Sequence, residues 1–454
     1  MKKISLSALV AAGVLAGGMS TANAADLGVG GNCCADLEER IAELEATTVR
    51  KGNRKVSLTI SGWVSQQLTI WDDGVERNAY ISDIGSTLNS HFKLTGSAQI
   101  ASGVSAGYLM QVEVVGNENL ALNANTSAAG KGLAVIQSFW FLKSDTLGKL
   151  SVGTQSSAAD NAALLPDGSG SLAFANYIMY DINGFGIRNS VGGQSGINWG
   201  ALATCQGFKG GDALGLGADC DGVPNNNIRY DTPVFAGFSA SASWGEDDVW
   251  AFSGRYAAEF NSVKVSLAAG YFQTNDTTGA AAGSPDAAAR ARGGKDASAL
   301  QLGAYVQHVP TGLFVYGAYA RDYNDTTGAT FAGQQQKDAD NFYIKAGIRQ
   351  KWNALGNSVL YGEYGENNDK FGNFLWVQGV NNSTLTQYGV GFVQEIDAAA
   401  MAIFLNYRHY EADVSCRAGG TGICSTSSGG TLNGGSIGGL QDADLFKVGA
   451  LINF

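Results

Sequence analysis

Charged residues are scarce in this chain of 454 residues, because Asp, Glu, Lys and Arg make up only 15% of it. The usual share is about 25%. The excess of 40 acids over 29 bases gives a net charge of -11, which argues against nucleic acid as a partner. Beyond the N-terminus, no apolar run approaches the roughly 18 residues that a transmembrane helix needs. The composition therefore excludes a helical membrane protein.

Catalytic and cofactor-binding patterns are also missing. The chain has three histidines, His91, His308 and His409, and none lies at a recognised spacing from Ser or Asp. The Gly-rich stretch 207–217 lacks the Gly-Lys-Ser/Thr of a phosphate-binding loop. The six cysteines match no zinc pattern. We therefore expect no enzymatic activity, no metal and no cofactor.

The N-terminus carries the features of an export signal. Two lysines precede the apolar run 4–18, and Ala22-Asn23-Ala24 supplies the small residues that a signal peptidase requires. We predict a signal peptide over residues 1–24, with cleavage before Ala25. The mature protein is then expected to leave the cytoplasm.

Cysteines of an exported chain can form disulfides, because the bacterial periplasm is kept oxidising. Cys205 and Cys220 lie in one long segment, and Cys416 and Cys424 lie together near the end of the chain. We predict one bond within each pair, and closing a loop of about 15 residues contributes about 3 kcal/mol in the chain-entropy model. A bond between neighbours is strained, so we expect Cys33-Cys34 to pair between chains or to stay reduced.

Alternation of apolar and polar residues dominates the rest of the sequence. Val56, Leu58 and Ile60 alternate with Ser57 and Thr59, which is the two-residue period of a strand with one apolar face. The pattern recurs and predicts sixteen strands. They cover residues 56–70, 92–100, 104–114, 135–142, 149–155, 227–232, 237–245, 249–259, 262–273, 298–308, 313–321, 341–351, 357–366, 384–395, 399–411 and 443–454.

The connections between these strands alternate in length. Short turns such as 102–103 and 260–261 are followed by longer loops such as 116–133 and 274–297, and only 246–248 breaks the alternation. Short periplasmic turns, long external loops and an even number of strands are typical of a closed outer-membrane barrel.

The prolines and the end of the chain favour the same fold. All five prolines fall in predicted turns or loops, as expected if strand interiors in lipid need every backbone donor. The last predicted strand alternates up to the aromatic Phe454. A soluble sandwich rarely combines these features with sixteen strands and an export signal. We predict an all-β fold, a 16-stranded antiparallel transmembrane β-barrel over residues 54–454.

The segment 156–226 is the long interruption of this pattern. Loops above about 15 residues are usually functional or disordered, and we predict that this one folds back into the lumen as a constriction. Asp160, Asp167 and Asp181 outnumber Arg188 in its first half. Five bases of the wall alternate with apolar residues along their strands, which places their side chains on the inner face of the barrel. They are Lys93, Arg229, Arg255, Lys345 and Lys447.

Facing charges of opposite sign across a narrow waist create a transverse field that slows apolar solutes more than ions and polar ones. We therefore expect an electrostatically polarised constriction. The alternative is that these bases merely solvate a wide lumen.

A short helical pattern precedes the first strand. Leu37, Ile41 and Leu44 form an apolar seam of less than two heptads, which is too short to be stable alone. We predict a periplasmic arm over residues 25–53, in which the subunits of an oligomer form a short coiled coil. A plug helix or a frayed arm is the alternative.

Six stretches of the sequence carry a family resemblance. They are Asp36 to Glu45, Arg50 to Val56, Trp71 to Gly74, Asn227 to Pro233, Gly237 to Ser241, and Tyr407 to Asp413. In these stretches the chain resembles the alphaproteobacterial porins of the rhizobial type. The resemblance implies a 16-stranded trimeric general porin whose third extracellular loop, here 156–226, narrows the lumen.

The function expected from the whole sequence is passive diffusion of small hydrophilic solutes and ions across the bacterial outer membrane. The expected partners are outer-membrane lipid, lipopolysaccharide and two further copies of the chain. The mature start Ala25-Asp26 resembles that of barrels tied to peptidoglycan, which implies peptidoglycan as a further partner of the arm. The alternatives are a substrate-selective channel and an adhesin or cell-wall-anchoring barrel.

Overall fold

The computed structural model describes most of the chain beyond residue 55. The described residues are 56–85, 89–116, 122–125, 132–178, 181–205, 219–222, 224–245, 248–274, 297–324, 330–331, 334–424 and 439–454. The predicted signal peptide, the arm with Leu37, Ile41 and Leu44, and the Cys33-Cys34 pair all lie outside these residues.

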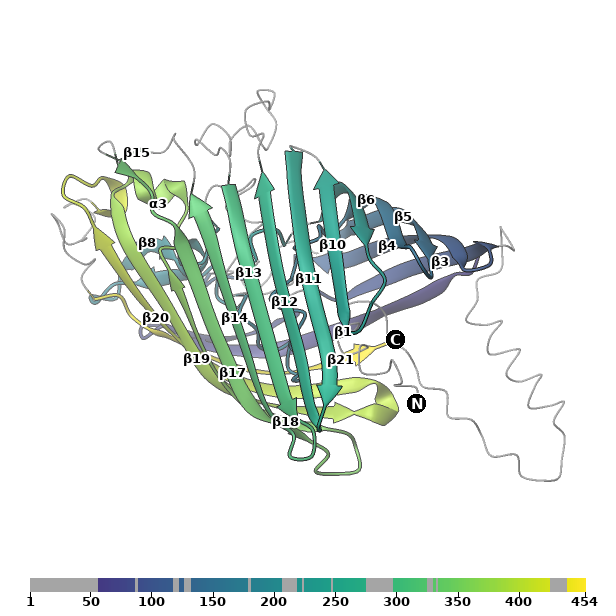
Figure 1. Ribbon diagram of the computed structural model, residues 1–454. Helices are drawn as coiled ribbons and strands as arrows, with labels where there is room; N and C mark the ends of the chain where they lie inside the picture. Colours follow the sequence, from purple (N-terminus) through teal and green to yellow (C-terminus); the bar gives the residue numbers. More distant parts are fainter. Residues whose placement is uncertain are drawn as a thin grey trace.

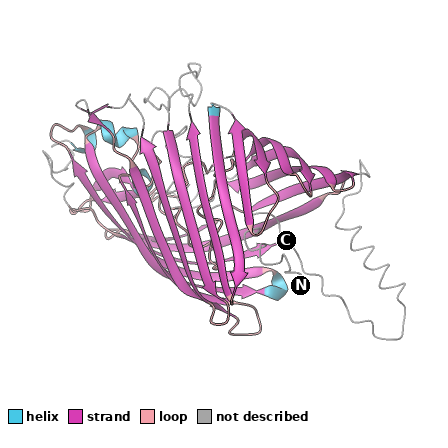
Figure 2. Ribbon diagram, in the orientation of Figure 1, coloured by secondary structure: helices cyan, strands magenta, loops and turns pink. Residues whose placement is uncertain are grey.

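One antiparallel sheet forms the wall of the molecule (Figures 1 and 2). The strands of the wall are β1 (Thr59–Asp72), β3 (His91–Ala101), β4 (Val104–Val115), β5 (Gly132–Ser144), β6 (Gly148–Gln155), β9 (Asn225–Asp231), β10 (Phe238–Gly245), β11 (Val249–Phe260), β12 (Val263–Thr274), β13 (Ala297–His308), β14 (Leu313–Asn324), β17 (Ala339–Gln350), β18 (Ser358–Asn368), β19 (Val380–Ile396), β20 (Met401–Cys416) and β21 (Ala443–Asn453).

The sheet closes on itself through β1. One edge of this strand pairs with β21, and the other pairs with β3 over Thr59 to Trp63. Farther along β1, this second edge pairs with the short strand β2 (Arg77–Ser82) in place of β3. Among the described residues the sheet has seventeen strands, and without β2 the closed barrel has sixteen. The predicted fold class is confirmed.

The remaining elements are short. They are the hairpins β7 (Gly186–Arg188) with β8 (Gln194–Asn198) and β15 (Thr330–Phe331) with β16 (Gln334–Gln335), the helix α3 (Asn373–Val377), and the 3-10 turns η3 (Trp199–Leu202), η5 (Asp397–Ala399) and η6 (Gly422–Cys424). None of the helices in the described part of the chain is both long and apolar enough to cross a membrane.

The outer face of the barrel carries large apolar side chains. On β17, Phe342 and Ile344 are exposed, while Tyr343 and Lys345, which alternate with them, are buried on the inner face. A soluble protein rarely exposes a continuous apolar surface of this kind, whereas a membrane barrel requires it because this face contacts lipid.

A bulge changes the parity of one strand. The register between β4 and β5 shifts at Gln111 and Val112. On β5, the odd-numbered Leu133 and Val135 are exposed before the shift, and the even-numbered Trp140 and Leu142 are exposed after it. The extra residue of a bulge reverses the faces of every position that follows.

Candidate functional site

The segment between β6 and β9, residues 156–224, is here called the inner loop, and several of its residues, among them Ala158, Asp167 and Asp181, contact inward-facing side chains of the barrel wall. It runs along the inner wall, and its Ala163 carbonyl accepts a hydrogen bond from Tyr316 of β14 at 2.7 Å. A Cβ at Gly303 of β13 would lie 2.3 Å from the same carbonyl oxygen. The wall therefore needs glycine here so that the backbone of the inner loop can approach.

The first charged contact of the inner loop is an ion pair with β17. Lys345 donates to Asp167 at 2.6 Å and to the Ala175 carbonyl at 2.7 Å. The side chains of both ionic partners are 0% exposed. The ammonium group also lies 5.5 Å from the ring centre of Tyr361. One lysine of the wall thus fixes two points of the inner loop.

The second charged contact is centred on Asp181. It accepts from Lys447 of β21 at 2.6 Å, from Arg408 of β20 at 2.5 Å and from Tyr410 at 2.8 Å. Burial alone would raise the pKa of Asp181, but Lys447 and Arg408 hold this pKa well below its usual range. Arg408 in turn donates to both carboxylate oxygens of Glu363, at 3.0 and 2.9 Å.

Two of the three predicted acids thus meet two of the predicted bases, Asp167 with Lys345 and Asp181 with Lys447. The charges are in direct contact, whereas the sequence led us to expect them on opposite sides of a water-filled waist. Arg408 and Glu363 were missed as site residues. The available indication was strand parity, which places both on the inner face of their strands.

The third predicted acid, Asp160, lies in a group of buried carboxylates with Asp219 and Asp221, and the predicted base Arg255 is near it. Burial and then the charge of Asp219 raise the pKa of Asp160 well above its usual value. Burial likewise raises the pKa of Asp219, and it raises the pKa of Asp221 to about 8. Ser157 donates a hydrogen bond to Asp221. This end of the inner loop therefore carries less negative charge at neutral pH than its sequence suggests.

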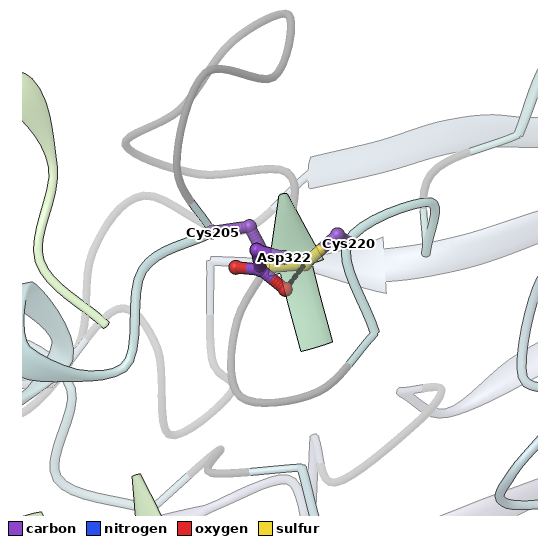
Figure 3. A group of neighbouring side chains, drawn as sticks. All are labelled: Cys205, Cys220 and Asp322. Atoms are coloured by element: carbon purple, nitrogen blue, oxygen red, sulfur yellow. Dashed lines mark hydrogen bonds between the residues drawn. A yellow bond between two sulfur atoms is a disulfide. The ribbon is translucent and has the colours of Figure 1, made fainter. Parts of the chain in front are cut away.

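A disulfide fixes the part of the inner loop that leads back to β9. Cys205 bonds to Cys220, and Cys416 bonds to Cys424. Figure 3 shows the first of these bonds against Asp322 of β14. Lys370 donates to both oxygens of Asp322, at 3.0 and 2.8 Å, and both of these side chains are fully buried.

The ligand atoms of Cys205, Cys220 and Asp322 lie within 4.8 Å of one another, which is close enough for a shared metal ion. The two sulfurs are bonded to each other, however, and metal binding requires a thiolate. This group therefore fits a structural role with the disulfide formed.

The other predicted bases occupy different positions on the wall. Arg229 of β9 donates to the carbonyls of Ser156 and Ser157 at 3.2 and 2.8 Å, and so it holds the start of the inner loop. Lys93 is buried on β3, opposite Gln111 of β4. In Arg255 of β11, the Nε atom is buried and has no hydrogen-bond partner among the described residues.

A closed 16-stranded barrel with an apolar outer face and a loop fastened along its inner wall defines a channel protein of the bacterial outer membrane. The sequence also matches the family model described as Gram-negative porin over residues 6–415, and the chain belongs to that family. The protein is therefore an outer-membrane porin, a water-filled channel for passive diffusion of small solutes.

Two solved structures support the fold. The anion-selective porin from Comamonas acidovorans is 16% identical with a TM-score of 0.51, and the match covers 88% of this chain and 100% of that one. OprB of Pseudomonas putida is 9% identical with a TM-score of 0.50, and the match covers 92% of this chain and 97% of that one. A comparison with curated protein sequences finds no match.

Proposed function

We propose that this porin is a general diffusion channel in which the inner loop forms the constriction and Arg255 sets a preference for anions. The observation that carries the proposal is the pairing of the inner-loop acids. Asp167 and Asp181 are buried against bases of the wall, so their charges are largely cancelled where they stand. The charges that lack an opposite partner then decide the field inside the lumen.

Arg255 is the base with the least compensation in this region. The charged groups near it are Arg229, Asp231 and Asp160. Asp231 already pairs with Arg229 at 2.8 Å and with Lys149 at 3.4 Å, and burial raises the pKa of Asp160 well above its usual value, which favours the uncharged form of that carboxyl. The local balance is positive, which favours anions over cations.

The reversal potential of a single pore under a potassium chloride gradient tests this preference. Arg255→Gln should shift the reversal potential toward cation preference. Arg321→Gln is the matched control, because Arg321 lies on the outward-facing parity of β14 and pairs there with Asp338. A reversal potential unchanged by Arg255→Gln but shifted by Arg321→Gln would count against Arg255 as the determinant.

Neutralising the inner-loop acids gives a less direct test of the same field. Replacing Asp160, Asp167 and Asp181 together should move the ion preference toward anions. Because Asp167 and Asp181 also hold Lys345 and Lys447, this variant would loosen the inner loop as well. Arg255→Gln distinguishes more clearly between an effect of charge and an effect of the position of the inner loop.

We extend the proposal to the assembly. The apolar seam of Leu37, Ile41 and Leu44 favours a homotrimer joined by a coiled coil of the periplasmic arm, residues 25–53. The same arm would bind peptidoglycan, while the outer face of the barrel contacts membrane lipid and lipopolysaccharide. Purified cell-wall sacculi that lack this protein would contradict the peptidoglycan role. No enzymatic activity and no cofactor form part of the proposal.

A further inference from the structure

The inner face of β5 is open to the lumen, unlike the wall beneath the inner loop. Tyr316 and Lys345, which contact the inner loop, are 0% exposed. On β5 (Figure 1), Phe139 and Phe141 are partly exposed and Lys143 is exposed. These three side chains alternate with the outward-facing Trp140 and Leu142, so they point into the barrel. A solute that crosses the pore therefore meets them.

Glycines on the neighbouring strands position the two phenylalanine rings. Gly107 of β4 lies directly opposite Phe141, and a Cβ on this glycine would lie 2.3 Å from Cζ of the ring. The ring of Phe141 therefore lies over Gly107. On the other side, a Cβ at Gly153 of β6 would lie 2.9 Å from Cβ of Phe139. Neither glycine can be replaced without moving a ring. The wall thus presents two fixed aromatic side chains to the lumen.

Basic side chains lie beside these rings. Lys143 of β5 is directly opposite Lys149 of β6. The Lys149 ammonium lies 5.8 Å from the ring centre of Phe139 and 3.4 Å from the Asp231 carboxylate. Asp231 also pairs with Arg229 at 2.8 Å. One acid thus balances two bases, and Lys143 adds a third positive charge. This surplus attracts anions.

The rings and the free positive charge are close enough for one small molecule to contact both. Phe141 and Lys143 are two residues apart on the same face of β5, which is about 6.6 Å along the strand. That distance is comparable to the length of a benzoate ion. An inorganic anion would use only the charge, and a neutral aromatic molecule would use only the rings.

We propose that Phe139, Phe141, Lys143 and Lys149 form a binding platform for small aromatic carboxylates on the lumen wall. The ring of the solute packs against the phenylalanines, and its carboxylate contacts Lys143. An aliphatic carboxylate fits less well, because aromatic pairs gain energy beyond the area that they bury. The inference rests on the proposed function, and it adds a solute class to the anion preference assigned to Arg255.

Block of the chloride current through the full-chain protein in a planar bilayer tests the platform. The probes are benzoate, cyclohexanecarboxylate, which has the charge without the aromatic ring, and benzyl alcohol, which has the ring without the charge. A bound probe obstructs the lumen, so the concentration that halves the current measures its affinity. Benzoate should need about one fifth of the concentration that cyclohexanecarboxylate needs, a ratio that corresponds to about 1 kcal/mol. Benzyl alcohol should be weaker than benzoate.

Single substitutions locate the site. Phe141→Leu should raise the half-blocking concentration of benzoate about fivefold and leave that of cyclohexanecarboxylate nearly unchanged. Lys143→Gln should raise both values alike. Trp140→Leu is the matched control, because Trp140 is the next residue of β5 but is 49% exposed on the outer face; it should change neither value. A wild-type conductance without probe shows that each variant still forms the pore.

Three results would overturn the proposal. Equal half-blocking concentrations of benzoate and cyclohexanecarboxylate would exclude recognition of the ring, and benzyl alcohol as effective as benzoate would exclude recognition of the charge. Equal effects of Phe141→Leu and Trp140→Leu would exclude this part of the wall. The reversal potential in potassium chloride decides the role of Arg255 without any aromatic probe, so the platform and the proposed function can fail separately.

Discussion

Replacing Lys345 by Met should release the middle of the inner loop from the wall of the barrel. The variant leaves the carboxylate of Asp167 buried without its cation, and the Ala175 carbonyl loses its donor. Both ionic side chains are 0% exposed, so water does not compensate. Breaking one side of a buried ion pair costs about 3–5 kcal/mol.

The expected size of the effect follows from this cost. Since about 1.4 kcal/mol changes an equilibrium tenfold, the population with a detached inner loop should rise by a factor on the order of 10² to 10³. The double variant Lys345→Met/Asp167→Asn removes both charges and should recover most of the loss, because replacing a whole buried pair is often nearly neutral.

Hydrogen exchange of residues 160–178 and the noise of the open-channel current measure this detachment. Lys351→Met is the matched control, because Lys351 follows β17 and its pair with Asp397 at 3.5 Å has both side chains more than half exposed. Exposed pairs contribute only about 0–1 kcal/mol. Exchange at the wild-type rate in Lys345→Met, or a double variant no better than the single one, would refute the assigned role of the ion pair.

Three further predictions concern other parts of the protein. Asp221 has a pKa of about 8 in the folded inner loop, above the ordinary value of 3.8, so the stabilisation by its protonated form is complete below about pH 4 and is lost as the pH rises through 8. The noise of the open-channel current should therefore grow between pH 4 and pH 8. Asp221→Asn should flatten this dependence of the noise on pH. Opening the bond between Cys205 and Cys220 should raise current noise more than it lowers thermal stability, because the strand ladder holds the barrel; peptide mapping without reductant checks the bond itself. Deleting residues 33–48 should weaken trimer assembly, measured by light scattering, more than it changes conductance.

The strands could be predicted because lipid imposes a period of two on the wall. Lipid no longer imposes this period where a strand leaves the membrane. The strand predicted over 399–411 runs on as β20 to Cys416, and the one predicted over 313–321 runs on as β14 to Asn324. Backbone pairing continues in these extensions, but no apolar outer face is required there, so the alternation that marks a strand fades first.

The site was harder to predict than the wall. Parity turned Lys345 and Lys447 inward, and the same rule would have found Arg408. It could not pair any of them with Asp167 or Asp181, because the inner loop has no period from which its path could be inferred. The position of each acid depends on close backbone approaches and on a disulfide, and these become visible only in three dimensions.

In the proposed constriction, the pairing of charges, and not their number, decides which charges a solute meets. Apolar contacts could stabilise the inner loop, but an apolar surface tolerates sliding, whereas a buried ion pair is favourable in one position and costly in others. Asp167 and Asp181 fix the inner loop in this way and, by doing so, withdraw their charges from the lumen. On this proposal, the electric field in the lumen comes from charges that do not hold the inner loop in place. Arg255 is the clearest of these in the described chain, so its removal should alter ion preference without moving the inner loop.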